Sequence, residues 1–276
     1  MSFDPYEPYG PVVGTTVRVV TWNVWGRYGR WEERESGIEQ TLACVEPDVV
    51  GLVESWSTPD DSQVDLVARR LGLEHRCFAG GGDEGGWTSG LGVVSRWPVV
   101  TQEIRQLDGD DGDAFGAVLF TALDGPRGVV QLFVVALDYP LDGSARRQAQ
   151  VRQLVAFIQE VTRRRHPTIV CGDFNAGPDS DEMRALTGRA VTTAPGVVFY
   201  DAWELAGDGT PGCTWSNHNP LAAPAMYPDR RFDYILSAWP RAGAVGHPTH
   251  CELLGVVQAG EPELSDHYGV MADLRY

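Results

Sequence analysis

The chain has 276 residues and a formal net charge of −16, and all 22 of its basic residues are arginines. Non-specific binding of nucleic acid depends on a basic surface that neutralises phosphates, so this charge balance disfavours a non-specific DNA nuclease. Phosphate chemistry itself is not excluded, because the planar guanidinium group of arginine is well suited to phosphate oxygens.

The domain organisation is inferred from composition along the chain. Residues 1–14 have neither the basic start nor the apolar centre of a secretory signal, and the sequence contains no run of about 18 apolar residues. No linker rich in proline, glycine and serine divides the chain. We therefore expect an N-terminal extension over 1–14, a single domain over 15–276 and no membrane span, with the oligomeric state left open.

The five cysteines are odd in number and show no CxxC spacing. Disulfide frameworks and zinc sites usually carry paired or closely spaced cysteines. We interpret these as reduced, mostly buried thiols of a cytoplasmic protein.

Short apolar runs rich in β-branched residues predict eight strands along the chain. Two segments between them, the glycine-rich 80–92 and the acidic 108–113, are predicted to be exposed loops. The strands are expected at 17–22, 48–54, 91–95, 115–121, 129–136, 168–172, 232–236 and 268–274.

Helical patterns lie between several of these strands. Thr58 and Pro59 predict the N-cap and first residue of one helix. Ser144 is expected to cap a second helix, and Ser180 a short third one that ends before Gly188. The apolar stripes of the first two helices are interpreted as core faces: Val64, Val67, Ala68 and Leu71, and Val151, Leu154, Val155, Ile158 and Val161.

The most informative segment is 170–176, Val-Cys-Gly-Asp-Phe-Asn-Ala, where a β-branched run ends in a glycine and two polar residues. Residues i and i+2 of a strand point to the same side, so Asp173 and Asn175 are expected to face one pocket. Such strand ends line the clefts in which layered α/β folds bind ligands.

Three further polar residues follow or precede apolar runs in the same way: Asn23, Glu54 and Asp266. A hard cation such as Mg²⁺ prefers oxygen ligands from one or two carboxylates and keeps several of its waters. These three residues are therefore candidates for a magnesium site.

The motifs occur in a fixed order: TWN at 21–23, a glutamate at a strand end, GDFN at 172–175, RFDY at 231–234 and SDH at 265–267. This set resembles the endonuclease/exonuclease/phosphatase superfamily, which includes pancreatic-type deoxyribonucleases, abasic-site endonucleases, neutral sphingomyelinases and inositol-polyphosphate phosphatases. The resemblance implies an α/β fold, a four-layer α/β/β/α sandwich of two mixed β-sheets flanked by helices. Periodicity alone does not distinguish this from a doubly wound sheet.

The resemblance also implies a role for each polar residue in phosphoester hydrolysis. Glu54 would hold Mg²⁺, or Mn²⁺ as a substitute, with Asn23 and Asp266 near the same ion or a second one. Asp173 would orient or deprotonate the attacking water, because a carboxylate is the nearest base. Asn175 would donate its amide to a phosphoryl oxygen.

The remaining catalytic pair is expected to be His267 and Asp233. His267 would donate to, or bind, the scissile phosphate, and Asp233 would hydrogen-bond its ring and fix the tautomer. The segment 214–220 resembles the substrate-side loop of the family, so Trp215 and Asn217 are candidates for substrate binding. A buried indole is an equally open interpretation of Trp215.

One position departs from the family pattern. Relatives commonly carry a histidine followed by leucine after the strand at 130–135, whereas this chain has Ala136 followed by Leu137. Alanine supplies no hydrogen-bond donor. Another residue such as Tyr139 could take the place of the imidazole, the chain could be an engineered inactive variant, or it could be a binding protein without turnover.

Three functions follow from these observations. The first is a Mg²⁺-dependent phosphodiesterase or phosphatase acting on a small-molecule or lipid-derived phosphate ester. The second is an endonuclease or exonuclease on DNA or RNA, which would need a basic groove. The third is a catalytically impaired binding protein, motivated by Ala136. The only evident basic clusters for the second are Arg146, Arg147 and Arg152, and Arg163, Arg164 and Arg165.

Overall fold

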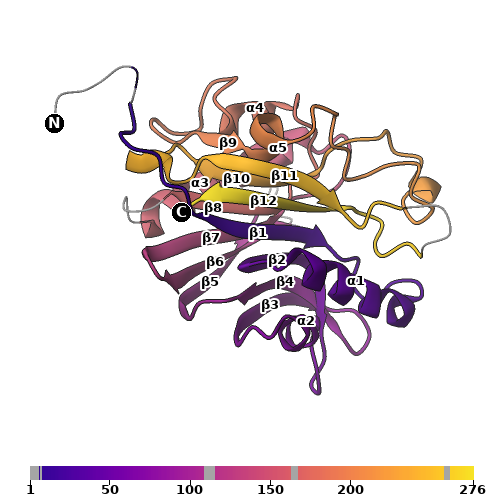
Figure 1. Cartoon of the computed structure of the whole chain (residues 1–276). Coiled ribbons are helices and arrows are strands. Elements are labelled where there is room, and N and C mark those ends of the chain that lie inside the picture. The colour runs from indigo at the N-terminus through magenta and orange to yellow at the C-terminus, as the bar shows by residue number, and fades with distance from the viewer. Residues whose placement is uncertain (1–5, 7, 109–115, 163–166, 258–261) are drawn as a thin grey trace.

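The computed structural model describes residues 6, 8–108, 116–162, 167–257 and 262–276. Two mixed six-stranded sheets pack face to face and helices cover their outer faces, which confirms the predicted sandwich (Figure 1). The first sheet has the order β11 (Pro248–Leu254), β12 (Gly269–Arg275), β1 (Thr16–Asn23), β2 (Val49–Ser57), β4 (Thr88–Ser95), β3 (His75–Asp83). The second has the order β5 (Val99–Leu107), β6 (Gly116–Gly125), β7 (Gly128–Ala136), β8 (Thr168–Asp173), β10 (Asp233–Ala238), β9 (Phe199–Asp201).

The two sheets repeat one arrangement of strands. Each has one parallel pair, β1 with β2 and β7 with β8, and all other paired neighbours are antiparallel. A helix connects each parallel pair, α1 (Trp31–Val45) in the first sheet and α3 (Ser144–Val161) in the second. Parallel strands need such a crossover, and their carboxyl ends then lie at the same edge of the sheet.

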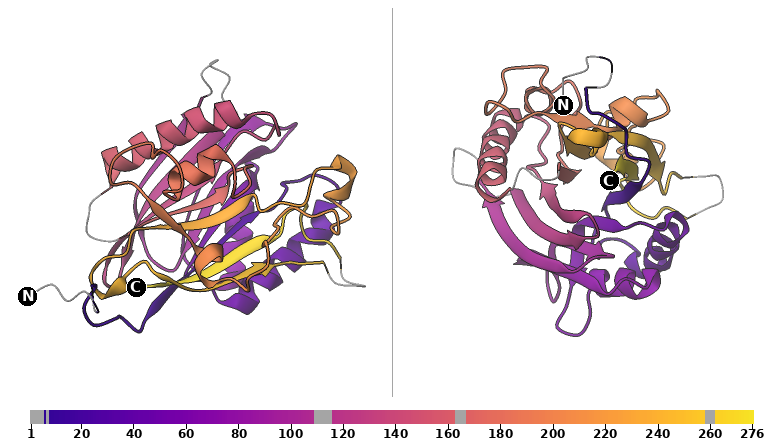
Figure 2. Two further views of the ribbon diagram at one scale, coloured as in Figure 1. Left: turned by 90° about the horizontal axis from the view of Figure 1, so that it is seen from above. Right: turned by 60° about the vertical axis from the view of Figure 1, so that its left-hand side comes forward.

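The other helices complete the outer layers. Figure 2 shows α3 on one flank of the sandwich, with α1 and α2 (Gln63–Leu71) on the opposite flank. The short α4 (Asp181–Leu186) packs with α3, and α5 (Ala202–Ala206) packs on β10 and β11. Two single turns of 3₁₀-helix occupy Ala223–Ala225 and Ala242–Ala244.

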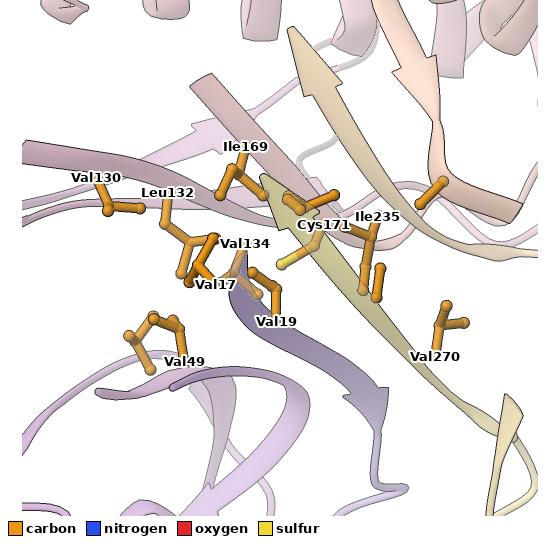
Figure 3. Close-up of a cluster of buried hydrophobic side chains, with 14 of the residues drawn as sticks. Val17, Val19, Val49, Val130, Leu132, Val134, Ile169, Cys171, Ile235 and Val270 are labelled. Atoms are coloured by element: carbon orange, nitrogen blue, oxygen red, sulfur yellow. The ribbon is translucent and has the colours of Figure 1, made fainter. Parts of the chain in front are cut away.

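Successive side chains of a strand point to opposite faces of its sheet, so each inner strand contributes to two apolar layers. In β1, Val17 and Val19 belong to the core between the sheets, whereas Val20 and Trp22 pack beneath α1 and α2. Ile169 and Cys171 of β8 also face the core between the sheets, as Figure 3 shows. The same parity carries the last residues of these strands to the rim of the space between the sheets.

The eight predicted strands are all present, but four others were missed: β3, β5, β9 and β11. These four are the edge strands of the two sheets. An edge strand buries less surface, so its apolar pattern is weaker. The predicted loop over 80–92 is also wrong, because most of it belongs to β3 and β4. There the glycines allow close approach: a Cβ on Gly90 would lie 2.3 Å from the carbonyl oxygen of Ala79.

The helices follow the predictions only in part. The N-cap of α2 is Ser62 and not Thr58, so Pro59 is not the first helical residue; Thr58 instead closes a turn with Asp61. Ser144 is the first residue of α3 rather than its cap. Ser180 caps α4 as predicted by accepting from the backbone N–H of Met183.

The helices α1 and α5 were not predicted at all. The first is mostly polar on its surface, so its short apolar pattern gives a weak signal. The stripe of α3 lies in the core beneath the second sheet as predicted, with Val161 only partly buried. Of the loop 108–113, only Asp108 is among the described residues, where it is exposed.

All five cysteines are free thiols, as expected, but only Cys171 and Cys251 are buried, so the expectation of mostly buried thiols is wrong. None of the helices in the described part of the chain combines the length and apolar character that crossing a membrane requires. The predicted extension over 1–14 touches the body of the protein, because the backbone of Val13 donates to Gly243 at 2.9 Å. The division into extension and domain stays a prediction.

Candidate active site

A row of four residues crosses the second sheet at the ends of its strands. Ala117 of β6 pairs in register with Ala136 of β7, Ala136 with Asp173 of β8, and Asp173 with Asp233 of β10. Residues paired in register point to the same face of a sheet. Two carboxylates and two methyl groups therefore line the same rim of the space between the sheets.

Glu54 reaches this rim from the first sheet through an irregularity in β2. Strict alternation would place it on the helix side, because its neighbour Val53 faces the core between the sheets. The pairing of β2 with β4 shifts register between Leu52 and Ser55, and Glu54 has a φ of 53°. Such a bulge re-aims a side chain, and it occurs often beside active sites.

Asn23 joins the carboxylates of the two sheets. Its Nδ2 donates to Glu54 Oε1 at 2.9 Å and to Asp173 Oδ2 at 3.1 Å. Its Oδ1, the one side-chain atom able to bind a cation, accepts from the backbone N–H of Trp25 at 3.1 Å. This arrangement orients both carboxylates, so Asn23 positions the site, and its role near a metal ion stays a prediction.

His267 stands between two aspartates. Its Nδ1 lies 2.8 Å from Asp233 Oδ2, and its Nε2 lies 3.8 Å from Asp173 Oδ2. A carboxylate at Nδ1 fixes the tautomer and leaves Nε2 facing the space beside the second carboxylate. The ring edge also contacts the indole of Trp215, with centroids 5.0 Å apart and planes at 76°.

The electrostatics of the cluster are dominated by burial. Burial, and after it the charge of Asp233, raise the pKa of Asp173 to about 7. Burial alone lowers the pKa of His267, but the charges of Asp233 and Asp173 outweigh it and raise that pKa well above its usual value. The imidazole is therefore held as an imidazolium ion between them.

Glu54 and Asp266 carry the other negative charges of the rim. Burial raises the pKa of both carboxyl groups, and the charge of Asp266 raises the pKa of Glu54 further. Arg34 and His267 are the cations that oppose this at Asp266. Interacting carboxylates with an excess of negative charge are stabilised by a cation, and oxygen donors of this kind suit Mg²⁺ or Mn²⁺.

Ligand atoms of Asp173, Asp233 and His267 also lie within 4.8 Å of one another, which is close enough to hold an ion. However, Asp233 Oδ2 already lies 2.8 Å from the imidazole Nδ1, which leaves this trio fewer free ligand atoms. Glu54 and Asp266 stay the predicted ligands of a divalent cation.

Asn175 is held next to the row. It has a left-handed φ of 50°, its backbone N–H donates to Asp173 Oδ1 at 2.9 Å, and its Nδ2 donates to the carbonyl of Leu137 at 2.9 Å. An amide has two N–H donors, so one remains for a phosphoryl oxygen.

The predicted substrate-binding residues lie at different depths. Trp215 is buried against Phe232, and its Nε1 has no hydrogen-bond partner among the described residues. Asn217 is exposed, and its Nδ2 donates to the carbonyl of Tyr227 and to Asp229. Tyr139 is 60% exposed, and no hydrogen bond links it to the cluster in the described part of the chain. These three assignments stay predictions.

Three buried residues that support the site were missed. Arg34 donates to five backbone carbonyls, four in the loop 24–28 and that of Leu264. Asn219 donates to the carbonyls of Ser265 and Asp266, and Thr214 Oγ1 accepts from the backbone of Asp233. The Asn-Pro pair at 219–220 predicts a turn and could have drawn attention to Asn219. The sequence around Arg34 gave no comparable signal, because its helix was not predicted.

The basic clusters considered for nucleic acid are engaged in the fold where they are described. Arg147 is buried and bonds Glu182 at 2.7 Å, and Arg146 bonds Asp138 at 3.1 Å. Arg152 has interactions of its own, and 163–165 lie outside the described residues. These pairs offset the charge of Arg146 and Arg147, and the absence of a basic groove stays a prediction.

Comparison with known proteins identifies the family and agrees with the fold. Residues 20–267 match the model of the Endonuclease/Exonuclease/phosphatase family. A humanized TDP2 of D. rerio is 23% identical with a TM-score of 0.72, covering 95% of this chain and 99% of that one. The endonuclease/exonuclease/phosphatase of Beutenbergia cavernae is 22% identical (TM-score 0.71; 95% and 72% covered). The human Nocturnin catalytic domain with bound sulfate is 20% identical (TM-score 0.71; 95% and 96% covered).

The comparison with curated proteins gave no match. The similar solved structures support the fold alone. Because the family model covers most of the sequence, the chain belongs to the endonuclease/exonuclease/phosphatase family, whose members are generally phosphoester hydrolases and commonly use divalent metal ions.

Proposed function

We propose that this family member is a Mg²⁺-dependent phosphoester hydrolase acting on a small phosphate ester. One observation carries the proposal: a continuous chain of contacts runs from Glu54 through Asn23 to Asp173 and from Asp173 through His267 to Asp233. A carboxylate suited to a cation, a candidate base and a charged imidazole thus meet at one rim.

Asp173 is the general base of the proposed reaction. Its pKa of about 7 lies near neutrality, where a carboxylate both stays partly ionised and accepts a proton effectively. The attacking water gives its proton to Asp173 as its oxygen bonds to phosphorus. The bond from phosphorus to the ester oxygen breaks, and the leaving oxygen takes a proton from solvent.

His267 and Asn175 stabilise the charge that develops on the phosphoryl oxygens. The imidazolium Nε2 and the remaining amide N–H are fixed in place by Asp233 and by the carbonyl of Leu137. Preorganised donors of this kind give one of the largest contributions to catalysis. A divalent cation held by Glu54 and Asp266 would add positive charge beside the same oxygens.

The test is hydrolysis of bis-p-nitrophenyl phosphate with Mg²⁺, with a chelator as the control, beside plasmid DNA and an abasic oligonucleotide. We expect release of nitrophenolate that needs the metal, and no nicking at moderate salt. A double variant lacking both Asp173 and His267 serves as the blank for contaminating hydrolases.

The other outcomes favour the alternatives. Salt-sensitive nicking of plasmid without turnover of the small ester would make the chain a nuclease. If no substrate is hydrolysed but phosphate still binds, the chain would be a binding protein, and the loss of turnover would be assigned to Ala136.

A further inference from the structure

Three aromatic residues lie next to the candidate metal carboxylates, and we call them the aromatic shelf: Trp25, Tyr28 and Trp87. The first two lie two and five residues after Asn23, and the third lies in the turn between β3 and β4. The ring of Tyr28 lies 6.1 Å from that of Trp25 and meets the ring of Trp87 at 5.4 Å and 77°. Such spacings are those of packed aromatic pairs.

The shelf borders Glu54 directly. Gly26, with φ of 40°, lies between the two: a Cβ on it would be 2.6 Å from the ring of Trp87 and 3.2 Å from the backbone oxygen of Glu54. No other residue type fits between the carboxylate-bearing bulge and the indole. The hydroxyl of Tyr28 also lies near enough to feel this charge, since burial first, and then Glu84 and Glu54, raise its pKa.

The shelf is held rigidly before any ligand arrives. The guanidinium of buried Arg34 donates to the carbonyls of Trp25, Gly26 and Tyr28, and it packs 4.9 Å from the ring of Trp25. Trp25 itself has a φ of 55°, a conformation that a bulky residue adopts only when its surroundings enforce it. A preorganised surface loses little entropy when it binds a ligand.

The shelf nevertheless stays accessible. Tyr28 is 40% exposed despite its two ring neighbours, and Trp25 and Trp87 are only half-buried. Its outer side is acidic, because Glu84 accepts from the hydroxyl of Tyr28 at 3.4 Å. A planar uncharged ring finds stacking partners there, whereas a second phosphate would meet a carboxylate.

We propose that the aromatic shelf binds a planar ring on the scissile phosphate, so that the preferred substrate is a ring-bearing phosphate ester such as an aryl or mononucleoside phosphate. The inference rests on the proposed function, because it places the phosphate at Glu54 and Asp173. Its source of selectivity is stacking, which depends on the ring and not on a particular base.

Two matched ligand pairs test it by calorimetry or tryptophan fluorescence with Mg²⁺ present: adenosine 5′-monophosphate against ribose 5-phosphate, and phenylphosphonate against methylphosphonate. In each pair only the ring differs. The variants are Tyr28→Ala and Tyr28→Phe. The control is Trp239→Ala, because Trp239 is 54% exposed and follows the end of β10 that lies opposite Asp233.

We expect the ring-bearing member of at least one pair to bind about tenfold more tightly. Tyr28→Ala should abolish this preference, whereas Tyr28→Phe and Trp239→Ala should keep it. Preference in the nucleotide pair alone would identify a base, and in the phosphonate pair alone a phenyl ring. Equal binding within both pairs, or a preference that survives Tyr28→Ala, would refute ring binding at the aromatic shelf. The proposed hydrolase function would still stand. Failure of every ligand to bind would refute the shelf and the proposed function together.

Discussion

Introducing an imidazole at position 136 should raise the proposed hydrolase activity. Ala136 is paired in register with Asp173, and neighbouring strands lie about 4.8 Å apart, so a side chain at 136 projects beside the candidate base. Ala117, the next residue in the row, is also small and half-buried and leaves room for a ring.

The size of the gain can be bounded. One preorganised donor to a developing oxyanion is worth about 10²–10³ in kcat. The new imidazole would lack a partner that fixes its tautomer, as Asp233 does for His267, so we expect a smaller gain of about tenfold or more, or about 1.4 kcal/mol. Overpacking of this rim should cost about 1–3 kcal/mol of stability.

The assay compares kcat/KM for bis-p-nitrophenyl phosphate in wild type, Ala136→His and Ala117→His, with thermal melts of each. The second variant adds the same ring one strand further from Asp173, so it should melt lower without gaining activity. If Ala136→His folds and is no faster than the wild type and Ala117→His, position 136 has no catalytic role in this chain.

Three other substitutions test separate parts of the site. Glu54→Gln should raise the Mg²⁺ concentration for half-maximal activity by about tenfold or more, because an amide oxygen binds the ion less tightly; an unchanged metal titration would contradict the assignment. Asp173→Asn should lower kcat by at least about 10² while phosphate binding persists; a parallel loss of binding would indicate a binding role instead. Glu35→Gln tests a buried carboxyl whose pKa burial raises from 4.5 to about 6. A raised pKa means that the folded state holds the proton more tightly than the unfolded chain does. The free energy of unfolding of the wild type therefore decreases as the pH rises from about 4.5 through about 6. Urea melts at pH 4 and pH 7 measure the free energy of unfolding of both proteins. Between these two pH values the variant should gain about 2 kcal/mol relative to the wild type. A difference that does not change with pH would refute this.

The inner strands of both sheets could be predicted because they are buried on both faces and therefore consist of continuous apolar runs. Val17, Val19 and Val20 alternate between two apolar layers, so all three are apolar and the run is unmistakable. The four strands that sequence reasoning missed are the outermost ones, and β5 exposes much of its surface. An edge needs no continuous apolar run, which is why its signal is weak.

The candidate site could be predicted as a set of residues but not as a geometry. Asp173 and Asn23 stand at strand ends where alternation gives their direction. Glu54 points the right way only because of a bulge, and the sequence shows no sign of that irregularity. Arg34 is recognisable only after folding, when its guanidinium gathers the carbonyls of the loop 24–28 and that of the distant Leu264.

The pairing of β1 with β12 makes the first sheet depend on contacts between segments that are far apart in the sequence. Residues 99–238 supply the whole second sheet, whereas the first sheet needs Thr16–Asn23 beside Gly269–Arg275. Closing a loop of that length is slow, and until it closes β1 presents an open edge to other chains. Asp266 and His267 arrive only with the final strand. The carboxylates of the site, which repel one another, are therefore all present only once this last segment is in place. The same segment carries the imidazolium that offsets their charge.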